Sequence, residues 1–573
     1  MLTVIRGILK DALKNLASRG VITTEELPDA PVERPKIEEF GDFGTPLPLV
    51  LAKQLRRSPK ECATMLLETM ERREDLFEKV EFASPGYINF TVKKDAWFRL
   101  LKQILDSPET FGNSDVGKGE RVLIEFVSAN PTGPLHVGHA RGAVVGDALA
   151  RIMRASGYAV STEYYINDVG NQIATFGLSV WARARETLGL QNENDFPENG
   201  YRGDYVRNIA LSLLKDKEFE HLFKMPYEEV GKSDKNPITD YAIQAMLKHI
   251  KEDLEDLGVT FDLWFSESSL YESGLVTQLV QNLIRIGKAY KDEKGALLFA
   301  MEGQDEKDRV IIRTNQMPTY FASDIAYHVN KFARGFTRLI NIWGADHHGY
   351  IPRVKKALEV LGYDPQKLEI ILVQMVSLTR GGQAIPMGKR IGEFVTLRDL
   401  INEVGKDAVR FIFLLRKPDA QMEFDLDLAK AQTLENPVFY VQYGHARVAS
   451  IMRKASALGA TFTGRVDKAC KYLTLPEEVR IAKELGMFPF VVSSSATRRE
   501  PHHIAFYLLD LAKAFHSYYT KYRHTEKVIT RDVEKTEARL FLVECVRRVL
   551  ARGLELLGVN APEEMHIEEV EHD

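Results

Sequence analysis

The sequence is poor in cysteine and contains no long apolar run. Its 573 residues include only three cysteines, Cys62, Cys470 and Cys545, which are scattered along the chain. This number and spacing exclude a disulfide framework or a zinc knuckle and indicate a reducing compartment. Because no run of about 18 apolar residues occurs, we expect no membrane-spanning helix and no membrane partner. The first twenty residues have the amphipathic pattern of a domain's first helix rather than of a signal peptide.

The sequence also lacks a strong charge of one sign. Its 76 lysines and arginines against 81 aspartates and glutamates give a net charge of −5. This balance argues against a protein surface that is basic all over and coats nucleic acid, but RNA binding needs only local basic patches. The length predicts several domains with a sizeable core.

Three regions differ in their sequence patterns. Residues 1–112 predict an α+β module with an opening helix, one helix through LAKQL and ATMLLETM, and the strand-like VEFASPGYINFTV. Residues 113–415 alternate strand-like runs such as ILVQMV with helical runs such as IPRVKKALEVLG, which favours a Rossmann-like α/β region with a parallel sheet and insertions. Residues 416–573 have helical periodicity to the end, which predicts an all-helical bundle.

The segment from residue 125 to residue 153, EFVSANPTGPLHVGHARGAVVGDALARIM, carries the clearest chemical signal. An apolar run over residues 122–127 predicts a buried strand, and a Pro- and Gly-bearing turn leads from it into a helix that starts close to HVGH. His136, Gly138 and His139 would then lie at a helix N-terminus, where unpaired N–H groups and the helix dipole suit phosphate. Imidazoles there can stabilise charge that develops on a triphosphate, and the glycine lets a flat base approach the backbone. The pattern indicates nucleotidyl transfer from ATP, although an isolated HxGH could equally be two ordinary surface or core histidines.

This segment resembles the ATP-binding signature of class I aminoacyl-tRNA synthetases, in the form carried by arginyl-tRNA synthetases. The resemblance continues in the family's order through YYINDVGNQI, FDLWFSESSLYE, YFASDIAYH, WGADHHGY and NPVFYVQYGHAR, and it covers nearly the whole chain. It implies that ATP activates L-arginine to an adenylate with loss of pyrophosphate, and that arginine then passes to the terminal adenosine of tRNA(Arg). It also implies Mg²⁺ with ATP, no tightly bound protein-coordinated metal, a cytoplasmic location, and a need for tRNA before activation. We expect a monomer.

The resemblance assigns a second ATP-binding element to QAIPMGKRIGEF, residues 383–394. It corresponds to the mobile loop of class I synthetases that is usually written KMSKS. Here Pro386 and Gly388 replace the first lysine and the serine, but Lys389 is kept. The resemblance implies that Met387 and Lys389 bind ATP and that Lys389 is catalytic together with the two histidines. The two departures put the energetics of the loop in doubt.

In WGADHHGY the resemblance implies that Gly344, Asp346 and His347 border the nucleotide. Consecutive Asp, His and His residues have poor spacing for ligands of one metal ion, so we expect no metal site here.

The resemblance places the arginine substrate on Glu125, Asn130, Tyr320 and Asp324. Asp324 follows Tyr320 by four residues, one helical turn later on the same face. A guanidinium pairs well with carboxylates, so Asp324 would hold it, with Tyr320 shaping the pocket and Asn130 and Glu125 holding the α-amino end. Without the resemblance, Asp324 could be a helix cap and Glu125 half of an internal ion pair.

For tRNA, the resemblance implies an elbow contact by Tyr87 and Asn89 in the first region and anticodon binding by the helical bundle. Tyr443 and Arg447 are candidates there because stacking and phosphate neutralisation hold single-stranded loops. The alternative for each aromatic is packing in its own domain. The pair His502–His503 predicts a polar helix start, or at most an RNA-phosphate contact.

Two other functional classes remain open from the sequence. One is a different HxGH nucleotidyltransferase, against which the Tyr320–Asp324 pair argues. The other is a catalytically silent tRNA-binding paralogue, for which the altered PMGKR loop is the only hint.

Overall fold

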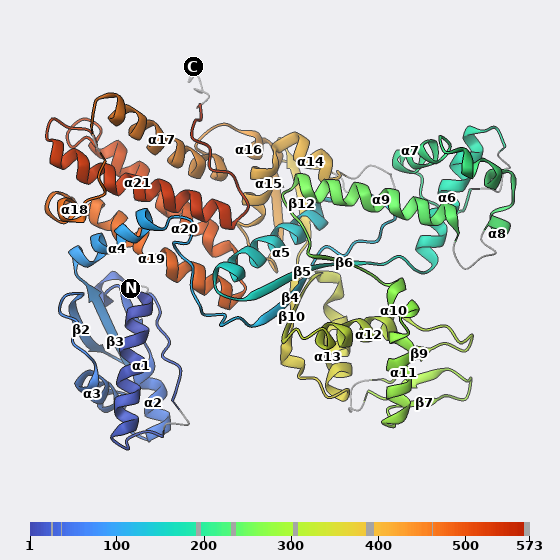
Figure 1. Cartoon of the computed structure of the whole chain (residues 1–573), viewed down its shortest axis with the longest axis horizontal. Helices are drawn as coiled ribbons and strands as arrows, with labels where there is room; N and C mark the ends of the chain where they lie inside the picture. Colours follow the sequence, from blue (N-terminus) through green and yellow to red (C-terminus); the bar gives the residue numbers. More distant parts are fainter. Residues whose placement is uncertain are drawn as a thin grey trace.

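The computed structural model describes residues 1–23, 27–35, 37–190, 196–230, 236–301, 307–385, 395–460 and 462–566, apart from the side chain of Glu38. Figure 1 shows an N-terminal module at one end, a helical bundle above it, and a central sheet from which two insertions project on the opposite side. In the part that the structure describes, no helix is long and apolar enough to cross a membrane. The three cysteines are free, as their spacing predicted.

The N-terminal module is α+β, as predicted. Helix α1 (Leu2–Ser18) precedes an antiparallel sheet of order β1-β3-β2, and α4 (Lys94–Asp106) leads out of the module. The sheet strands are β1 (Phe43–Thr45), β2 (Phe77–Ala83) and β3 (Tyr87–Val92).

The prediction of one helix through LAKQL and ATMLLETM was wrong, because two helices form there, α2 (Leu47–Leu55) and α3 (Pro59–Thr69). Arg56 takes a left-handed conformation with φ 53° and ends α2. Ser58 then starts α3 by forming a capping box with Glu61, and Pro59 occupies the first turn. Local capping therefore interrupts an apolar spacing that is otherwise continuous.

The central sheet is parallel and has the order β11-β10-β4-β5-β6. Its strands are β4 (Arg121–Glu125), β5 (Ala159–Ile166), β6 (Leu263–Ser266), β10 (Arg338–Gly344) and β11 (Leu368–Val373). The chain begins in the middle strand, builds outward through β5 and β6, and then returns to the other side of β4. This doubly wound order confirms the Rossmann-like prediction and creates a switch point between β4 and β10.

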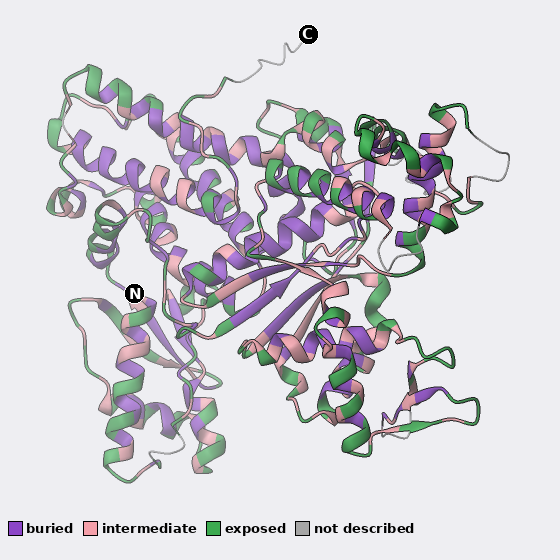
Figure 2. Ribbon diagram, turned by 45° about the vertical axis from the view of Figure 1, so that its right-hand side comes forward, coloured by how far each residue is buried: buried purple, intermediate pink, exposed green. Residues whose placement is uncertain are grey.

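Helices cover both faces of the central sheet. Val122 and Ile124 pack in the large core that contains α5 (Val137–Ala155), whereas Leu123 packs in a separate cluster with residues of α12 (Tyr320–Ala333) and α13 (Ile351–Val360). Successive side chains of β4 thus point to opposite faces, and both faces are apolar. Figure 2 shows these central strands largely buried.

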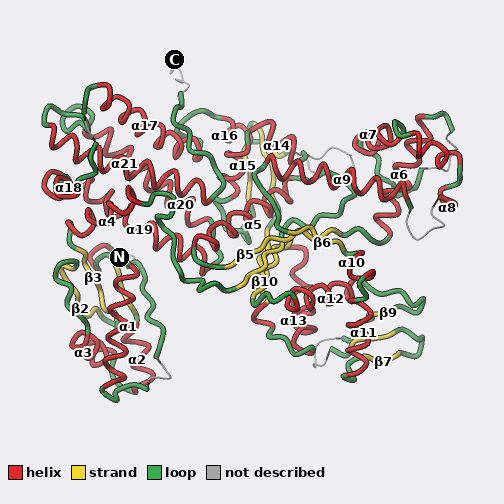
Figure 3. Tube along the Cα trace, viewed as in Figure 1, coloured by secondary structure: helices red, strands yellow, loops and turns green. Residues whose placement is uncertain are grey.

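Two insertions interrupt the central region. The first, between β5 and β6, is helical, and the second, between β6 and α12, ends in an antiparallel sheet of order β7-β8-β9 (Figure 3). Their elements are α6 (Asn171–Thr187), α7 (Asp204–Leu213), α8 (Tyr227–Val230), α9 (Pro237–Asp256), α10 (Ser268–Glu272), α11 (Leu275–Arg285), β7 (Ala289–Lys291), β8 (Leu297–Phe299) and β9 (Arg309–Ile312).

The prediction that only helices follow residue 416 was wrong at one place. Met422–Asp425 form β14, which pairs in parallel with β12 (Val376–Arg380), and β13 (Gln383–Ala384) completes that small sheet. Met422 and Phe424 are buried while Glu423 is exposed, a strand alternation too short for periodicity to reveal. The helices around it are α14 (Leu397–Val404), α15 (Lys406–Phe413) and α16 (Leu426–Lys430).

The C-terminal bundle contains α17 (Pro437–Ala457), α18 (Val466–Tyr472), α19 (Pro476–Arg498), α20 (His502–Tyr522) and α21 (Val533–Leu556). A buried arginine of α15 joins it to the central region. Arg410 donates from Nε to the carbonyl of Leu557 at 2.8 Å and from Nη1 to that of Leu257 at 3.1 Å, and it forms an ion pair with Asp147 of α5. One guanidinium thereby connects the ends of α21 and α9 to the helix that follows β4.

Candidate active site

The described residues that were predicted to bind ATP and arginine lie near one edge of the central sheet. The segments that follow β4, β5, β6 and β10 all start at the carboxyl ends of parallel strands, so they emerge on the same side. Ligands of open α/β sheets bind at this edge, next to the switch point. The edge carries two features, the histidine turn at residues 136–139 and a group of three carboxylates, Glu125, Glu267 and Asp324, which we call the acidic pocket.

The histidine turn begins α5, as predicted. His136 is the N-cap residue, and its Nδ1 accepts a hydrogen bond from the Gly138 amide at 3.1 Å. The His139 Nδ1 accepts one from the His136 amide at 3.3 Å, and the two rings stack with centroids 3.7 Å apart. Since both Nδ1 atoms face the backbone, each Nε2 lies on the opposite edge of its ring. A Cβ at Gly138 would lie 3.0 Å from the His136 ring, so the stacked arrangement favours glycine there.

The lysine loop itself, including Pro386, Met387, Gly388 and Lys389, lies outside the described residues. Its flanks are described, and the segment after it is joined to the histidine turn. Thr396 forms an antiparallel bridge with His136, and the Leu397 amide donates to the Leu135 carbonyl at 2.8 Å. The chain therefore leaves the loop beside HVGH.

WGADHHGY continues from β10 into a short 3₁₀ helix, η4 (Ala345–Tyr350). Gly344, Asp346 and His347 are exposed at the carboxyl end of β10, and β10 pairs directly with β4. The His347 Nε2 lies 3.6 Å from Asp346 Oδ2. The three residues thus occupy the other side of the switch point from the histidine turn.

Asn130 and Tyr320, two of the residues expected to bind arginine, line one cavity. Both line a cavity of about 270 Å³ together with Asn167 and Gln172. Asn130 Nδ2 donates to Gln172 Oε1 at 2.6 Å. Tyr320 is half exposed and packs against Gly170, where a Cβ would lie 2.3 Å from the phenol oxygen.

Asp324 lies one turn further along α12, and two neighbours hold its carboxylate. The Tyr350 hydroxyl donates to Oδ2 at 2.9 Å, and His328 Nδ1 lies 3.3 Å from Oδ1. Burial raises the pKa of Asp324, but His328 and the Tyr350 hydrogen bond outweigh it, so that the pKa is lowered. The carboxylate is therefore charged and fixed in position.

Glu125 forms the internal ion pair that the sequence left open as an alternative. Its Oε2 lies 2.5 Å from Lys331 Nζ, and its Oε1 accepts from Ser128 Oγ at 3.0 Å. Lys331 is fully buried and also donates to Asn341 at 3.1 Å. A substrate ammonium at Glu125 would have to share this carboxylate with Lys331.

Sequence reasoning missed Glu267, which directly follows β6. It is 1% exposed, its Oε1 accepts from Ser323 Oγ at 2.9 Å, and no ion pair holds it within the described ranges. Burial, followed by the charges of Asp168 and Asp324, raises the pKa of Glu267 to about 7. The only sequence signal was an acidic residue in FSESS after a strand, inside a quoted motif.

Tyr165 shows how closely the carboxylates converge. Burial raises the pKa of its hydroxyl, and the charges of Glu267, Asp324 and Glu125 raise it further. Three carboxylates thus act on one aromatic ring. Among the described residues, Lys331 pairs with Glu125, and His328 lies beside Asp324. Glu267 has no such partner within the part of the chain that the structure describes. Such a pocket suits a cationic ligand with several donors.

Comparisons with known proteins connect this geometry to a family. The family described as "Arginyl tRNA synthetase N terminal domain" matches residues 3–92, "tRNA synthetases class I (R), catalytic domain" matches residues 101–432, and "DALR anticodon binding domain" matches residues 441–565. The chain belongs to the arginyl-tRNA synthetase family. Relatives named arginine–tRNA ligase include one from Desulfosudis oleivorans, 46% identical over 99% of this chain and 100% of the relative, and one from Citrifermentans bemidjiense, 45% identical over 98% and 99%. The solved arginyl-tRNA synthetase of Thermus thermophilus is 25% identical, with a TM-score of 0.76, and covers 98% of this chain and 100% of that structure.

The two elbow candidates of this family member lie on the N-terminal sheet. Tyr87 is half buried, and a hydrogen bond to Glu33 raises the pKa of its hydroxyl. Asn89 is 8% exposed within β3, and its Oδ1 would lie 3.0 Å from a Cβ at Gly44 of β1. Asn89 therefore packs in the sheet, whereas Tyr87 keeps an exposed part.

The anticodon candidates lie together on α17, in the part of the chain that the DALR family matches. The Arg447 guanidinium lies 4.5 Å above the Tyr443 ring and donates to its hydroxyl at 3.1 Å. Both residues line a cavity of about 1000 Å³ at which cationic and aromatic side chains gather. These further residues include Arg453, Lys454, Tyr519, Tyr522, Arg523 and Lys527.

Proposed function

We propose that this chain is an arginine–tRNA ligase that works in two steps. The arginine carboxylate attacks the α-phosphorus of ATP, and the bond to pyrophosphate breaks. A ribose hydroxyl of the terminal adenosine of tRNA(Arg) then attacks the arginyl carbonyl, and AMP leaves. The observation that carries this proposal is the acidic pocket beside the histidine turn, because it brings a cation-binding site next to a phosphate-binding helix N-terminus.

ATP binds with its phosphates at the start of α5. The helix dipole favours an anion there, and the rings of His136 and His139 can donate to phosphate oxygens as charge develops. Lys389 neutralises the departing pyrophosphate, and Gly344, Asp346, His347 and Met387 border the nucleotide. Mg²⁺ enters with ATP, bound through the triphosphate as part of the substrate.

Arginine binds with its guanidinium between Asp324 and Glu267. A guanidinium is planar and permanently charged, so it can satisfy both carboxylates with paired hydrogen bonds. Tyr320 closes this side of the pocket, and Asn130 and Glu125 face the α-amino end. Among the described residues Glu267 has hydrogen-bond donors but no ion-pair partner, so a bound guanidinium would supply the missing positive charge, which makes the pocket selective for a cation.

tRNA is held at both ends of the chain. The exposed part of Tyr87, with Asn89 supporting the sheet beneath it, contacts the elbow. The basic and aromatic cavity at Tyr443 and Arg447 takes the anticodon loop, because stacking and phosphate neutralisation are sequence-tolerant ways to hold unpaired bases. The protein acts as a monomer in the cytoplasm.

The test is arginine-dependent exchange of pyrophosphate into ATP, measured with and without tRNA(Arg). The proposal predicts exchange that requires arginine and is strongest with tRNA present. Tight tRNA binding with no exchange under either condition would instead identify a silent paralogue. Exchange supported by another amino acid would refute the assignment of the pocket.

A further inference from the structure

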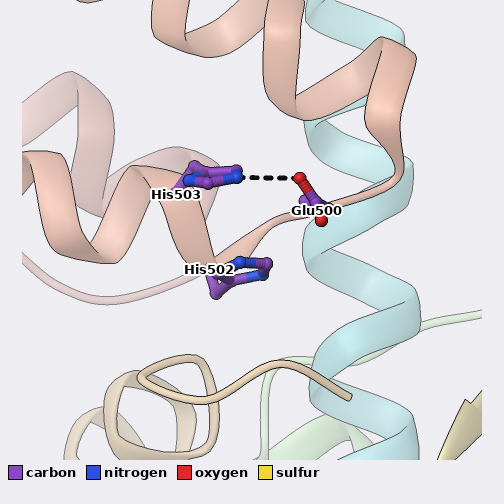
Figure 4. A group of neighbouring side chains, drawn as sticks. All are labelled: Glu500, His502 and His503. Carbon is purple, nitrogen blue, oxygen red and sulfur yellow. Dashed lines mark hydrogen bonds and ion pairs between the residues drawn. The ribbon is translucent and has the colours of Figure 1, made fainter. Parts of the chain in front are cut away.

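A cluster of potential metal ligands lies far along the chain from the site described above. Among the residues that the structure describes, Glu500, His502 and His503 have ligand atoms that all lie within 4.8 Å of one another. Glu500 lies in the turn between α19 and α20, and the two histidines begin α20. Figure 4 shows both imidazole rings extending from the first turn of α20 toward the side on which Glu500 lies. Arginine ligation gives this cluster no role.

One nitrogen of the cluster is buried without a partner. His502 is 1% exposed, and its Nδ1 has no hydrogen-bond partner in the described part of the chain. A buried polar atom is costly to leave unsatisfied, and each such atom in a folded protein calls for an explanation. The explanation that the neighbouring ligands support is a bound ion, which would accept the lone pair of this nitrogen.

The donor set suits a zinc-class ion. Zn²⁺ accepts two imidazole nitrogens and a carboxylate as ligands, whereas Mg²⁺ and Ca²⁺ prefer oxygen ligands. His503 Nε2 lies 2.8 Å from Glu500 Oε2. Ligand atoms of one tetrahedral zinc ion lie about 3.4 Å apart when the bonds to zinc are about 2.0–2.2 Å long. Modest side-chain rotations would therefore bring the three ligand atoms to these separations.

The competing cation at this cluster is weakly held. Lys417 Nζ lies 3.5 Å from Glu500 Oε1, but the Lys417 side chain is 59% exposed, so this pair contributes little. The side chains of Glu500 and His503 are themselves partly exposed, which leaves a path for an ion from solvent.

We propose that Glu500, His502 and His503 form a binding site for a zinc-class divalent ion, with water in the fourth position. This proposal departs from the sequence-based expectations of no protein-held metal and of an RNA contact at His502–His503. The site adjoins Arg499, whose Nε lies 3.1 Å from Glu369 Oε2 of β11. A bound ion would therefore stiffen the turn through which the bundle contacts the central sheet.

The test uses the full chain after treatment with a chelator, titrated with Zn²⁺ alone by calorimetry. The proposal predicts one ion per chain. His503→Gln and Glu500→Gln should each weaken binding at least about 100-fold, since even changes to groups behind the ligands cost about 10–100-fold. His249→Gln is the matched control, because His249 lies 3.9 Å from Glu252 as an exposed pair on α9 that belongs to no three-ligand group within the described ranges. That control should bind Zn²⁺ as the wild type does.

A second readout does not depend on any variant. Co²⁺ in place of Zn²⁺ should give the visible ligand-field bands of a four-coordinate site with nitrogen and oxygen ligands, and these bands should fade as pH falls and the ligands take up protons. Absence of stoichiometric Zn²⁺ binding, or a Co²⁺ spectrum of the hydrated ion only, would overturn the proposal. Wild-type affinity in both His503→Gln and Glu500→Gln, with melting temperatures unchanged in chelator, would also overturn it.

Discussion

Replacing Glu267 by Gln should make the substrate-free protein more stable at pH 8 while weakening its affinity for arginine. The pKa of this carboxyl is raised from 4.5 to about 7, chiefly by burial. A pKa increase of that size lowers the free energy of unfolding by about 3 kcal/mol at a pH where the carboxyl is ionised in both the folded and the unfolded chain. Glutamine keeps the shape but carries no charge, so the variant avoids that cost.

The pH dependence follows from the direction of this change. Below pH 4.5 the carboxyl is protonated in both states and the cost is absent. Between pH 4.5 and pH 7 the unfolded chain ionises first, so the free energy of unfolding of the wild type falls relative to that of Glu267→Gln. Above pH 7 the difference should approach its full value of about 3 kcal/mol.

Arginine binding should show the same titration. Because the guanidinium needs the ionised carboxylate, the wild-type Kd for arginine should tighten about tenfold from pH 6 to pH 8. Isothermal titration calorimetry measures this Kd, and thermal melting at the same pH values measures the stability. Glu267→Gln should bind arginine more weakly and lose the tenfold dependence, whereas Glu272→Gln, an exposed change on α10, should behave as the wild type. A Glu267→Gln variant with wild-type affinity and an unchanged pH profile would refute the reasoning.

Three further changes test other parts of the account. Lys331→Met should lower the free energy of unfolding, measured with denaturant, by about 3–5 kcal/mol because it leaves the buried Glu125 carboxylate without its ion-pair partner. Adding Glu125→Gln should restore most of the lost stability. Lys389→Ala should slow pyrophosphate exchange about 10²–10³-fold with unchanged tRNA affinity, and undiminished exchange would contradict its role. Arg447→Ala should weaken tRNA binding about tenfold in a filter-binding assay with the Kd for arginine preserved, and equal tRNA affinity would remove Arg447 from the anticodon site.

The sequence was sufficient to predict the parts of the fold that have long, regular patterns. The apolar run over residues 122–127 lies in β4 as far as Glu125, and the helix after HVGH begins at Val137 with His136 as its cap. Tyr320 and Asp324 lie one turn apart on α12, as their spacing predicted. These features depend on neighbours in the sequence, and for that reason periodicity and capping signals reveal them.

Other features depend on contacts that no local pattern encodes. β14 is a four-residue strand whose partner, β12, lies more than forty residues earlier, and the break between α2 and α3 depends on a left-handed Arg56. The raised pKa of Glu267 comes chiefly from its burial, and also from the charges of Asp168, which follows β5, and Asp324, which lies on α12. The domain boundaries and the roles assigned to the site residues stay predictions.

The central claim is that the acidic pocket selects arginine for attachment to tRNA. The most direct measurement is charging of tRNA(Arg), followed as acid-precipitable labelled amino acid, with arginine and lysine compared at equal concentrations. The account predicts that arginine is attached and lysine is not, because a lysine ammonium cannot satisfy Asp324 and Glu267 with paired hydrogen bonds. Equal charging with both amino acids, or charging with neither by a protein that binds tRNA(Arg) tightly, would contradict it.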